Sequence, residues 1–319
     1  MENKQKTNKL KITACISVTL LVIIVVLWLL QCLLMPKYMS EIKEGALISE
    51  YYNETTSHDV IFVGDCEVYE NISPITLWTE YGITSYIRGS AQQLAWQSYY
   101  LLEETFKYET PKVVVFNVYA LKYGEPQSEA YNRMTFDNMK WSSSKLKGIL
   151  ASMTEDESIV DYIFPLLRYH SRITELKSED LEYLWKKPKD NSDNGYLIKP
   201  GVRPMKPFDP ITEPPEELLP ESSLEYLDKM KELRDKNGAT LVLIKAPTNS
   251  RGYWWYDEWE SQIVEYAEKN QLDYYNFIPD AETMGIDWQT DTYDEGLHLN
   301  VYGAEKFTSY LGALLSESH

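Results

Sequence analysis

The sequence predicts an α/β domain with a parallel sheet, preceded by one membrane-spanning helix. Short apolar, β-branched runs alternate with amphipathic stretches from residue 57 onward, which is typical of a parallel sheet covered by helices on both faces. Residues 12–35 carry no charge and are rich in Leu, Ile and Val. As a helix, this segment is long enough to span about 30 Å of hydrocarbon.

The charges around the apolar segment predict its orientation. Four lysines lie before it, and mixed charges follow it. By the positive-inside rule, we expect a cytoplasmic tail at 1–11, a transmembrane helix at 12–35, a connector at 36–56 and an extracytoplasmic domain at 57–319. The sequence therefore predicts a single-pass protein of the cell membrane with its C-terminal domain outside.

Two other interpretations of the apolar segment fit the residues less well. A cleaved signal peptide has a shorter apolar core and a small-residue exit, and residues 31–37 offer neither. A lipid-modified Cys32 would follow Gln31, which fits that signal poorly.

Charge limits the expected partners. The chain of 319 residues has a formal net charge of −18, whereas nucleic-acid binding needs a basic face. We therefore expect no nucleic-acid partner. The sequence contains no metal-ligand cluster and no phosphate-binding glycine loop, so we also expect no cofactor and no metal.

Five apolar runs predict the strands, and helical spacing of apolar residues predicts the helices between them. The expected strands are 59–63, 83–87, 112–119, 239–246 and 272–277. The expected helices are 75–81, 92–108, 224–236 and 258–270, with a final helix near the C-terminus. Residues 121–222 separate the third and fourth strands and predict an insertion, helical at first and irregular after residue 188.

The first strand ends in a sequence that suits a reactive group. Gly64 stops the apolar run and is followed by Asp65 and Cys66. A strand that ends in Gly and leads into a nucleophilic side chain lifts that side chain above the sheet in α/β hydrolases. Cys15 and Cys32 lie in the apolar segment, so Cys66 is the only thiol of the predicted outer domain and has no intramolecular disulfide partner there. A small buried residue at a strand end is the other interpretation of Cys66.

Two further polar positions are candidates for the same site. Asn117 lies near the carboxyl end of the third strand, where open α/β sheets build their sites. His298 lies in an acidic loop before the final helix, in a setting where a carboxylate can orient an imidazole that serves as a base. A surface or capping role is the competing interpretation of a lone histidine.

Together these residues resemble the sequence blocks of the SGNH (GDSL) hydrolases. The matching positions, in the family's order, are Gly64-Asp65-Cys66, then Gly89, then Asn117, and finally Asp294/Glu295 with His298. The resemblance covers residue 59 to the end, apart from the insertion, and implies a flavodoxin-like α/β/α fold. It also implies a catalytic set of Cys66, His298 and Asp294 or Glu295, with oxyanion donors at Cys66, Gly89 and Asn117.

This chain departs from the family pattern at two positions. Cys66 stands where the family has serine, and the family spacing selects Glu295 as the acid whereas the Tyr-Asp context favours Asp294. Asp65 and Glu67 flank the thiol with negative charge, which raises a thiol pKa, so activation would depend on His298.

The sequence leaves functions of two classes open. One is a membrane-anchored esterase or O-acyltransferase that acts on a cell-envelope polysaccharide or teichoic acid. Such a protein is similar to those that D-alanylate teichoic acids or O-acetylate exopolysaccharides beside a multi-pass membrane acyltransferase. The other is an inactive SGNH-like protein that binds envelope glycans or that membrane partner, with an aromatic surface around 253–256 and Trp259.

Overall fold

The chain forms two compact units in a computed structural model. The structure describes residues 2–38, 42–186, 190–206, 218–249, 255 and 257–317. One unit comprises Met1–Met39 with Ser158–Lys189, and the other comprises Ser40–Glu157 with Asp190–His319. The predicted insertion at 121–222 is therefore divided, because its middle part belongs to the unit of the N-terminal helix.

The larger unit is built on one parallel sheet. Its strands are β1 Val60–Gly64, β2 Ser85–Gly89, β3 Val113–Asn117, β4 Thr240–Lys245 and β5 Asp273–Asn276. All neighbours pair in parallel, in the order β2-β1-β3-β4-β5. This order is the flavodoxin-like one, and the predicted fold class is confirmed.

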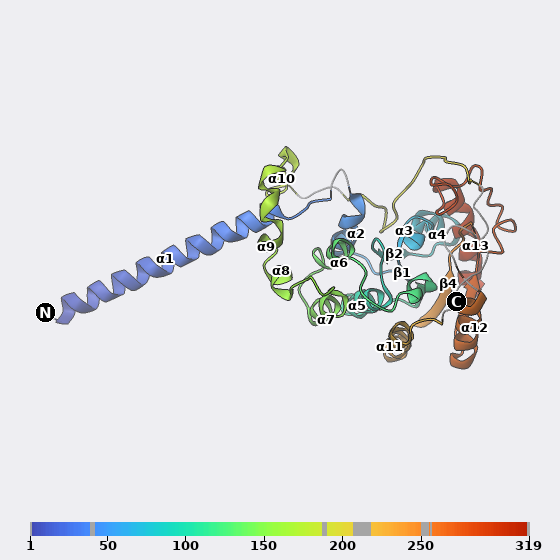
Figure 1. The fold of residues 1–319 in the computed structure, drawn as a ribbon, viewed down its shortest axis with the longest axis horizontal. Helices are drawn as coiled ribbons and strands as arrows, with labels where there is room; N and C mark the ends of the chain where they lie inside the picture. The colour runs from blue at the N-terminus through green and yellow to red at the C-terminus, as the bar shows by residue number, and fades with distance from the viewer. Residues whose placement is uncertain are drawn as a thin grey trace. The chain divides into compact units, whose positions relative to one another are not determined.

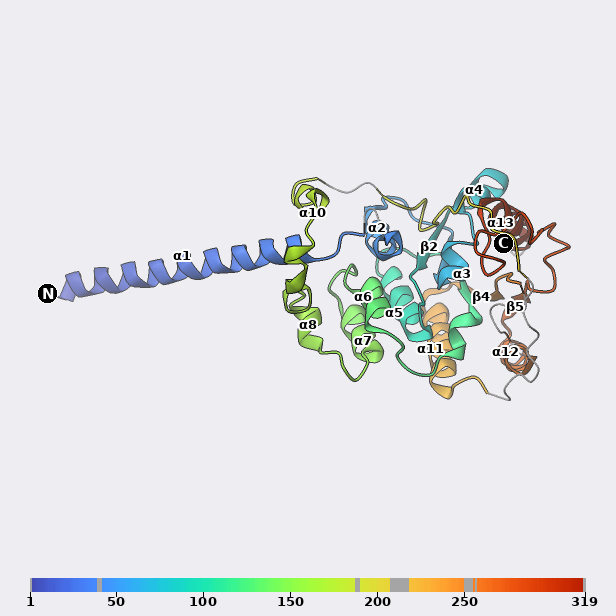
Figure 2. The same ribbon diagram turned by 45° about the horizontal axis from the view of Figure 1, so that its top comes forward.

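Helices cover both faces of this sheet, as Figures 1 and 2 show. The α-helices of the larger unit are α2 Leu47–Glu50, α3 Cys66–Tyr69, α4 Pro74–Tyr81, α5 Ala95–Thr105, α6 Glu129–Phe136, α7 Ser143–Ser152, α11 Glu221–Asn237, α12 Asp257–Asn270 and α13 Val301–Glu317. Short 3-10 turns lie at η1 Lys43–Ala46, η2 Tyr51–Asn53 and η3 Val118–Lys122.

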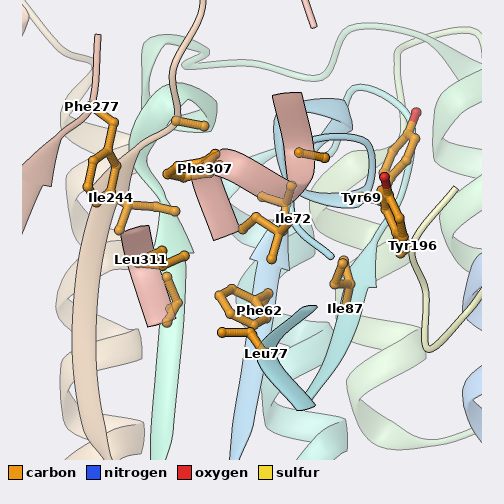
Figure 3. Packing of buried hydrophobic residues seen from close by; sticks show 14 of the residues in the cluster. Phe62, Tyr69, Ile72, Leu77, Ile87, Tyr196, Ile244, Phe277, Phe307 and Leu311 are labelled. Carbon is orange, nitrogen blue, oxygen red and sulfur yellow. The ribbon is translucent and has the colours of Figure 1, made fainter. Parts of the chain in front are cut away.

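Alternate strand residues enter two separate cores. Phe62 of β1 packs in a cluster with Leu77 of α4 and Phe307 of α13, and Figure 3 shows these side chains together. The next residue, Val63, lies in a second cluster with residues of α5, α11 and α12. Successive side chains of a strand point to opposite faces, so a buried β-branched run supplies both layers of a three-layer α/β/α domain.

Local sequence explains where α4 begins and ends. The Ser73 side chain accepts a hydrogen bond from Thr76 N–H at 3.2 Å, and Pro74 occupies the first turn. The helix ends at Gly82, whose φ of +67° is easily reached only without a Cβ.

The smaller unit contains the long N-terminal helix. Helix α1 spans Glu2–Leu34, and its residues Asn8–Leu34 are long and apolar enough to cross a membrane. The rest of the unit consists of α8 Ile159–Ile163, α9 Leu166–Tyr169, η4 His170–Thr174 and α10 Ser178–Glu182. Within the part of the insertion that was predicted to be helical, α8 and α9 are separate helices, because Pro165 disfavours helix at Phe164 and cannot donate a backbone hydrogen bond.

Gly64 allows the close approach of β1 to α3. A Cβ at this position would lie 2.4 Å from Val68 Cγ2, and the residue has a φ of +156°. At Gly82 the φ is also positive, but no atom lies within 4 Å of the added Cβ. An alanine at either position would strain the backbone, but only an alanine at Gly64 would also overlap a neighbouring side chain. Comparing the two variants therefore distinguishes overpacking from backbone strain.

We expect Gly64→Ala to lower the free energy of unfolding by about 1–3 kcal/mol more than Gly82→Ala, because only the former overpacks the core. Denaturant unfolding of the full-length protein in detergent measures both values. Equal losses for the two variants would contradict the packing argument.

Candidate active site

The carboxyl ends of the central strands bring the candidate residues to one edge of the sheet. Gly64 pairs with Gly89 at the ends of β1 and β2, and Asn117 ends β3 opposite Ile244 of β4. Sites of open α/β sheets form at this edge. The next residue of β4, Lys245, ends that strand.

Cys66 begins the short helix that follows β1. Asp65 caps this helix, since its Oδ1 accepts a hydrogen bond from Glu67 N–H at 3.1 Å. Cys66 is partly exposed, whereas Asp65 and Glu67 are buried. The turn therefore leaves the thiol accessible to solvent and buries both flanking carboxyl groups.

His298 connects the thiol to a carboxylate. Its Nδ1 lies 2.6 Å from Asp294 Oδ2, and its backbone N–H donates to Asp294 Oδ1 at 2.8 Å. The side chains of His298 and Cys66 form a hydrogen bond, which affects the pKa of both groups. Thiol, imidazole and carboxylate thus lie in one chain of contacts, although their residues are far apart in sequence.

The two acids considered from the sequence have different neighbours. Asp294 contacts the imidazole, whereas Glu295 has a φ of +71° and its Oε1 lies 2.7 Å from Arg203 and 2.6 Å from Lys206. The acid beside His298 is therefore the one four residues before it.

A second carboxylate near the imidazole was missed in the sequence. Glu70 Oε2 accepts a hydrogen bond from the Tyr293 hydroxyl at 2.6 Å and lies 3.6 Å from His298 Nδ1. Its other oxygen lies 3.2 Å from Lys199 Nζ. The Tyr293 ring stacks on the His298 ring with centroids 6.1 Å apart. No sequence motif marks Glu70, which is one helical turn beyond Cys66.

The pKa values of both proton-transfer groups are raised, that of Cys66 mainly by burial and that of His298 by its neighbours. Burial raises the pKa of the Cys66 thiol, His298 lowers it, and Asp65 and Glu70 raise it further. Burial alone would lower the pKa of His298, but Cys66, Asp294 and Glu70 hold it well above its ordinary value. Burial and the Glu67 charge raise the pKa of Asp65 to about 7. Near neutral pH, the resting Cys66 is therefore a thiol and not a thiolate.

Asn117 makes contacts that its sequence position did not predict. Its Nδ2 donates to Glu67 Oε2 at 2.8 Å and, over a longer distance of 3.4 Å, to Asp65 Oδ1. Its Oδ1 accepts from Ala246 N–H at 3.2 Å. The amide thus connects the end of β3 to the turn after β1 and to the end of β4.

A fully buried ion pair lies behind the thiol. Lys245 Nζ donates to both oxygens of Glu67 at 2.8 Å and to Ala246 O at 3.0 Å. Both side chains of the pair have 0% exposure. The sequence signal for this pair is Lys245 itself, a charged residue within an otherwise apolar run, although such a run by itself predicts only a strand.

Asn71 positions the His298 loop. Its Oδ1 accepts a hydrogen bond from Leu299 N–H at 2.8 Å, and its side chain is completely buried. The residue after His298 is thereby attached to the segment that follows Cys66. Gly89 lies beside the same turn, because a Cβ there would be 3.2 Å from Gly64 O and 3.1 Å from the Tyr69 ring.

The described residues also bear on metal binding and on the aromatic surface. Among the residues that the structure describes, no group of three or more His, Cys, Asp or Glu side chains is placed to hold a metal ion. Of the aromatic surface considered from the sequence, Tyr253, Trp254 and Tyr256 lie outside the described residues. Trp259 is buried, and its ring packs edge-on against Trp255 at 5.7 Å.

We expect Lys245→Met alone to lower the free energy of unfolding by about 3–5 kcal/mol, because it leaves the Glu67 carboxylate buried without its partner. Lys245→Met combined with Glu67→Gln removes both charges and should cost less. Denaturant unfolding of the full-length variants compares them. A single variant as stable as the double variant would contradict the role assigned to the pair.

No protein-family model and no curated protein matches this chain. A solved structure that is similar to it comes from Bacteroides fragilis and is provisionally assigned as an acylhydrolase. The two chains are 12% identical, the match covers 85% of this chain and 94% of the other, and the TM-score is 0.40.

Proposed function

We propose that the protein is a membrane-anchored, SGNH-like esterase or O-acyltransferase with Cys66 as nucleophile, His298 as base and Asp294 as the orienting acid. The observation that carries the proposal is the chain of contacts from the thiol through the imidazole to the carboxylate. This constellation activates nucleophiles on many unrelated folds.

The contacts support a two-step acyl transfer. Asp294 occupies Nδ1 of His298, which leaves Nε2 to take the proton of Cys66. The sulfur then attacks the acyl carbon, and the leaving alcohol takes the proton from His298 as the ester C–O bond breaks. In the second step a hydroxyl gives its proton to His298 and attacks the thioester, and the thiol is restored. Water as the acceptor gives an esterase, and a polymer hydroxyl gives an acyltransferase.

The oxyanion of each step needs donors on the Cys66 side of the sheet edge. We assign them to the backbone N–H groups of Cys66 and Gly89 and to the Asn117 amide. Asn117 has to release one of its contacts for this role. The 3.4 Å hydrogen bond to Asp65 is the longer of the two, and protonation of Asp65, whose pKa is about 7, would weaken it further.

The membrane anchor supports the choice of substrate. Helix α1 is long and apolar enough to cross a membrane, and the lysines before it favour an outward-facing C-terminal domain. A site held at the outer membrane surface would meet teichoic acids or envelope polysaccharides, and a multi-pass membrane acyltransferase could supply the acyl group. The proposed activity is therefore acylation or deacylation of a cell-envelope polymer.

Two observations favour a second candidate, an inactive SGNH-like protein that binds envelope glycans or a membrane partner. The Asn117 amide donates to two carboxyl groups, and the pKa of Cys66 is raised rather than lowered. Both features would suit a protein that keeps the arrangement of the site for binding but does not catalyse acyl transfer.

We expect Cys66→Ala to abolish cleavage of an activated acyl ester by the purified full-length protein, and Cys66→Ser to retain part of it. His298→Ala should reduce the rate by roughly 10²–10⁴-fold, because the nucleophile loses its base. The double variant Cys66→Ala/His298→Ala should be no worse than Cys66→Ala, since residues that act as a unit fail together.

Glu295→Gln is the matched control for Asp294→Asn, because only Asp294 contacts His298. Asp294→Asn should slow ester cleavage strongly and Glu295→Gln should leave it nearly unchanged. No ester cleavage by the unmodified protein, together with full complementation of a deletion strain by Cys66→Ala, would favour the binding function and exclude the mechanism.

The raised pKa values predict an alkaline rise in thiol reactivity. In a Cys15→Ser/Cys32→Ser background, alkylation of Cys66 by a neutral probe should accelerate as the pH rises from about 6 to about 10, because the thiolate forms only at high pH. His298→Ala should move this rise to higher pH, since His298 lowers the pKa of Cys66. A rise at lower pH in His298→Ala would contradict the assigned contact.

A further inference from the structure

Residues 158–186, here called the juxtamembrane segment, expose many large apolar side chains. Among the described residues of the chain outside α1, such side chains are much denser here than in the larger unit. They include Ile163, Phe164, Leu167, Ile173, Leu184 and Trp185. Phe164 is 58% exposed and Trp185 is 70% exposed. Exposed apolar surface of this density marks a binding surface.

The juxtamembrane segment is part of the same compact unit as α1. Helices α9 and α10 and the turn η4 contact α1. Figure 1 shows α9 and α10 at the C-terminal end of α1, and Figure 2 shows α10 there. Arg172 donates a hydrogen bond to the carbonyl oxygen of Leu34, the last residue of α1. The exposed apolar surface is therefore continuous with the end of the candidate membrane span.

The residues at this junction are those that suit the boundary between hydrocarbon and water. The Lys37 ammonium lies 5.1 Å from the centre of the Tyr183 ring, and Arg172 pairs with Asp180 at 3.2 Å. Tyr and Trp are enriched at this boundary, where Lys and Arg direct their charges toward water. Tyr183 and Trp185 lie within three residues of each other and are both exposed.

We propose that the juxtamembrane segment lies in the headgroup region of the phospholipid bilayer that α1 crosses, and gives the protein a second, interfacial contact with lipid. Helices that lie in the membrane plane bury their apolar side chains among the headgroups and upper acyl chains. Acidic and basic residues nearly balance within residues 158–186, so apolar burial drives the contact. Zwitterionic lipid is sufficient, and the contact persists at high salt.

Tryptophan quenching by brominated lipid tests the proposal in the full-length chain. The protein is reconstituted into nanodiscs of phosphatidylcholine with or without bromine on the upper acyl chain, in a Trp28→Phe background that removes the emission from α1. Trp185→Phe is compared with Trp141→Phe, a matched control because Trp141 is 55% exposed and lies in the larger unit. Both substitutions are conservative at exposed positions.

We expect Trp185→Phe to remove most of the bromine-quenched emission, at low and at high salt, and Trp141→Phe to remove only unquenched emission. Loss of unquenched emission from both variants would overturn the proposal. Shielding of Trp185 from an aqueous quencher in native membranes, but not in lipid nanodiscs, would show that the segment binds another membrane protein and would likewise overturn it.

Discussion

The buried ion pair between Glu67 and Lys245 is the interaction on which the candidate site depends. Moving the two charges out of water costs several kcal/mol per ion, and only close contact with complete hydrogen bonding offsets that cost. Here Lys245 contacts both carboxylate oxygens, and Asn117 donates to one of them. The turn after β1 is thus fixed to the ends of β3 and β4. Because Cys66 directly precedes Glu67, the same contacts hold the thiol at the sheet edge.

A second set of contacts holds the base against the thiol. Asn71 attaches the His298 loop to the segment after Cys66, and Asp294 contacts both the imidazole and the backbone of His298. The resulting excess of carboxylates raises the pKa of His298 and makes its imidazole a stronger base. Once the imidazole has taken the proton of Cys66, its positive charge stabilises the thiolate, whereas burial and Glu70 destabilise the thiolate. The Cys66 thiol therefore keeps its proton in the resting site, and the transfer of this proton to His298 has to accompany the approach of an acyl group.

The fold was predictable because β1, β2 and β3 are short, fully buried runs and β4 is nearly so. The alternation of such runs with amphipathic helices left few other topologies, and the resemblance in four blocks fixed the order of the candidate residues. The divided insertion was not predictable, since periodicity does not reveal that residues near 160–186 pack on α1. The Glu67–Lys245 pair was missed for a related reason. The two residues are separated by 178 positions, and only the folded chain places Lys245 beneath the turn.

The raised pKa of Cys66 bears on the risk of oxidation that the proposed extracytoplasmic position would bring to its thiol. Oxidation proceeds through the thiolate, so a thiol that stays protonated at neutral pH is slow to oxidise. A nucleophile with a permanently lowered pKa would react with oxidants whether or not substrate is present. In the proposed mechanism, His298 removes the proton only as the sulfur attacks the acyl carbon. Burial and the carboxyl groups of Asp65 and Glu70 therefore protect the resting thiol, while the hydrogen bond to His298 keeps it competent for acyl transfer.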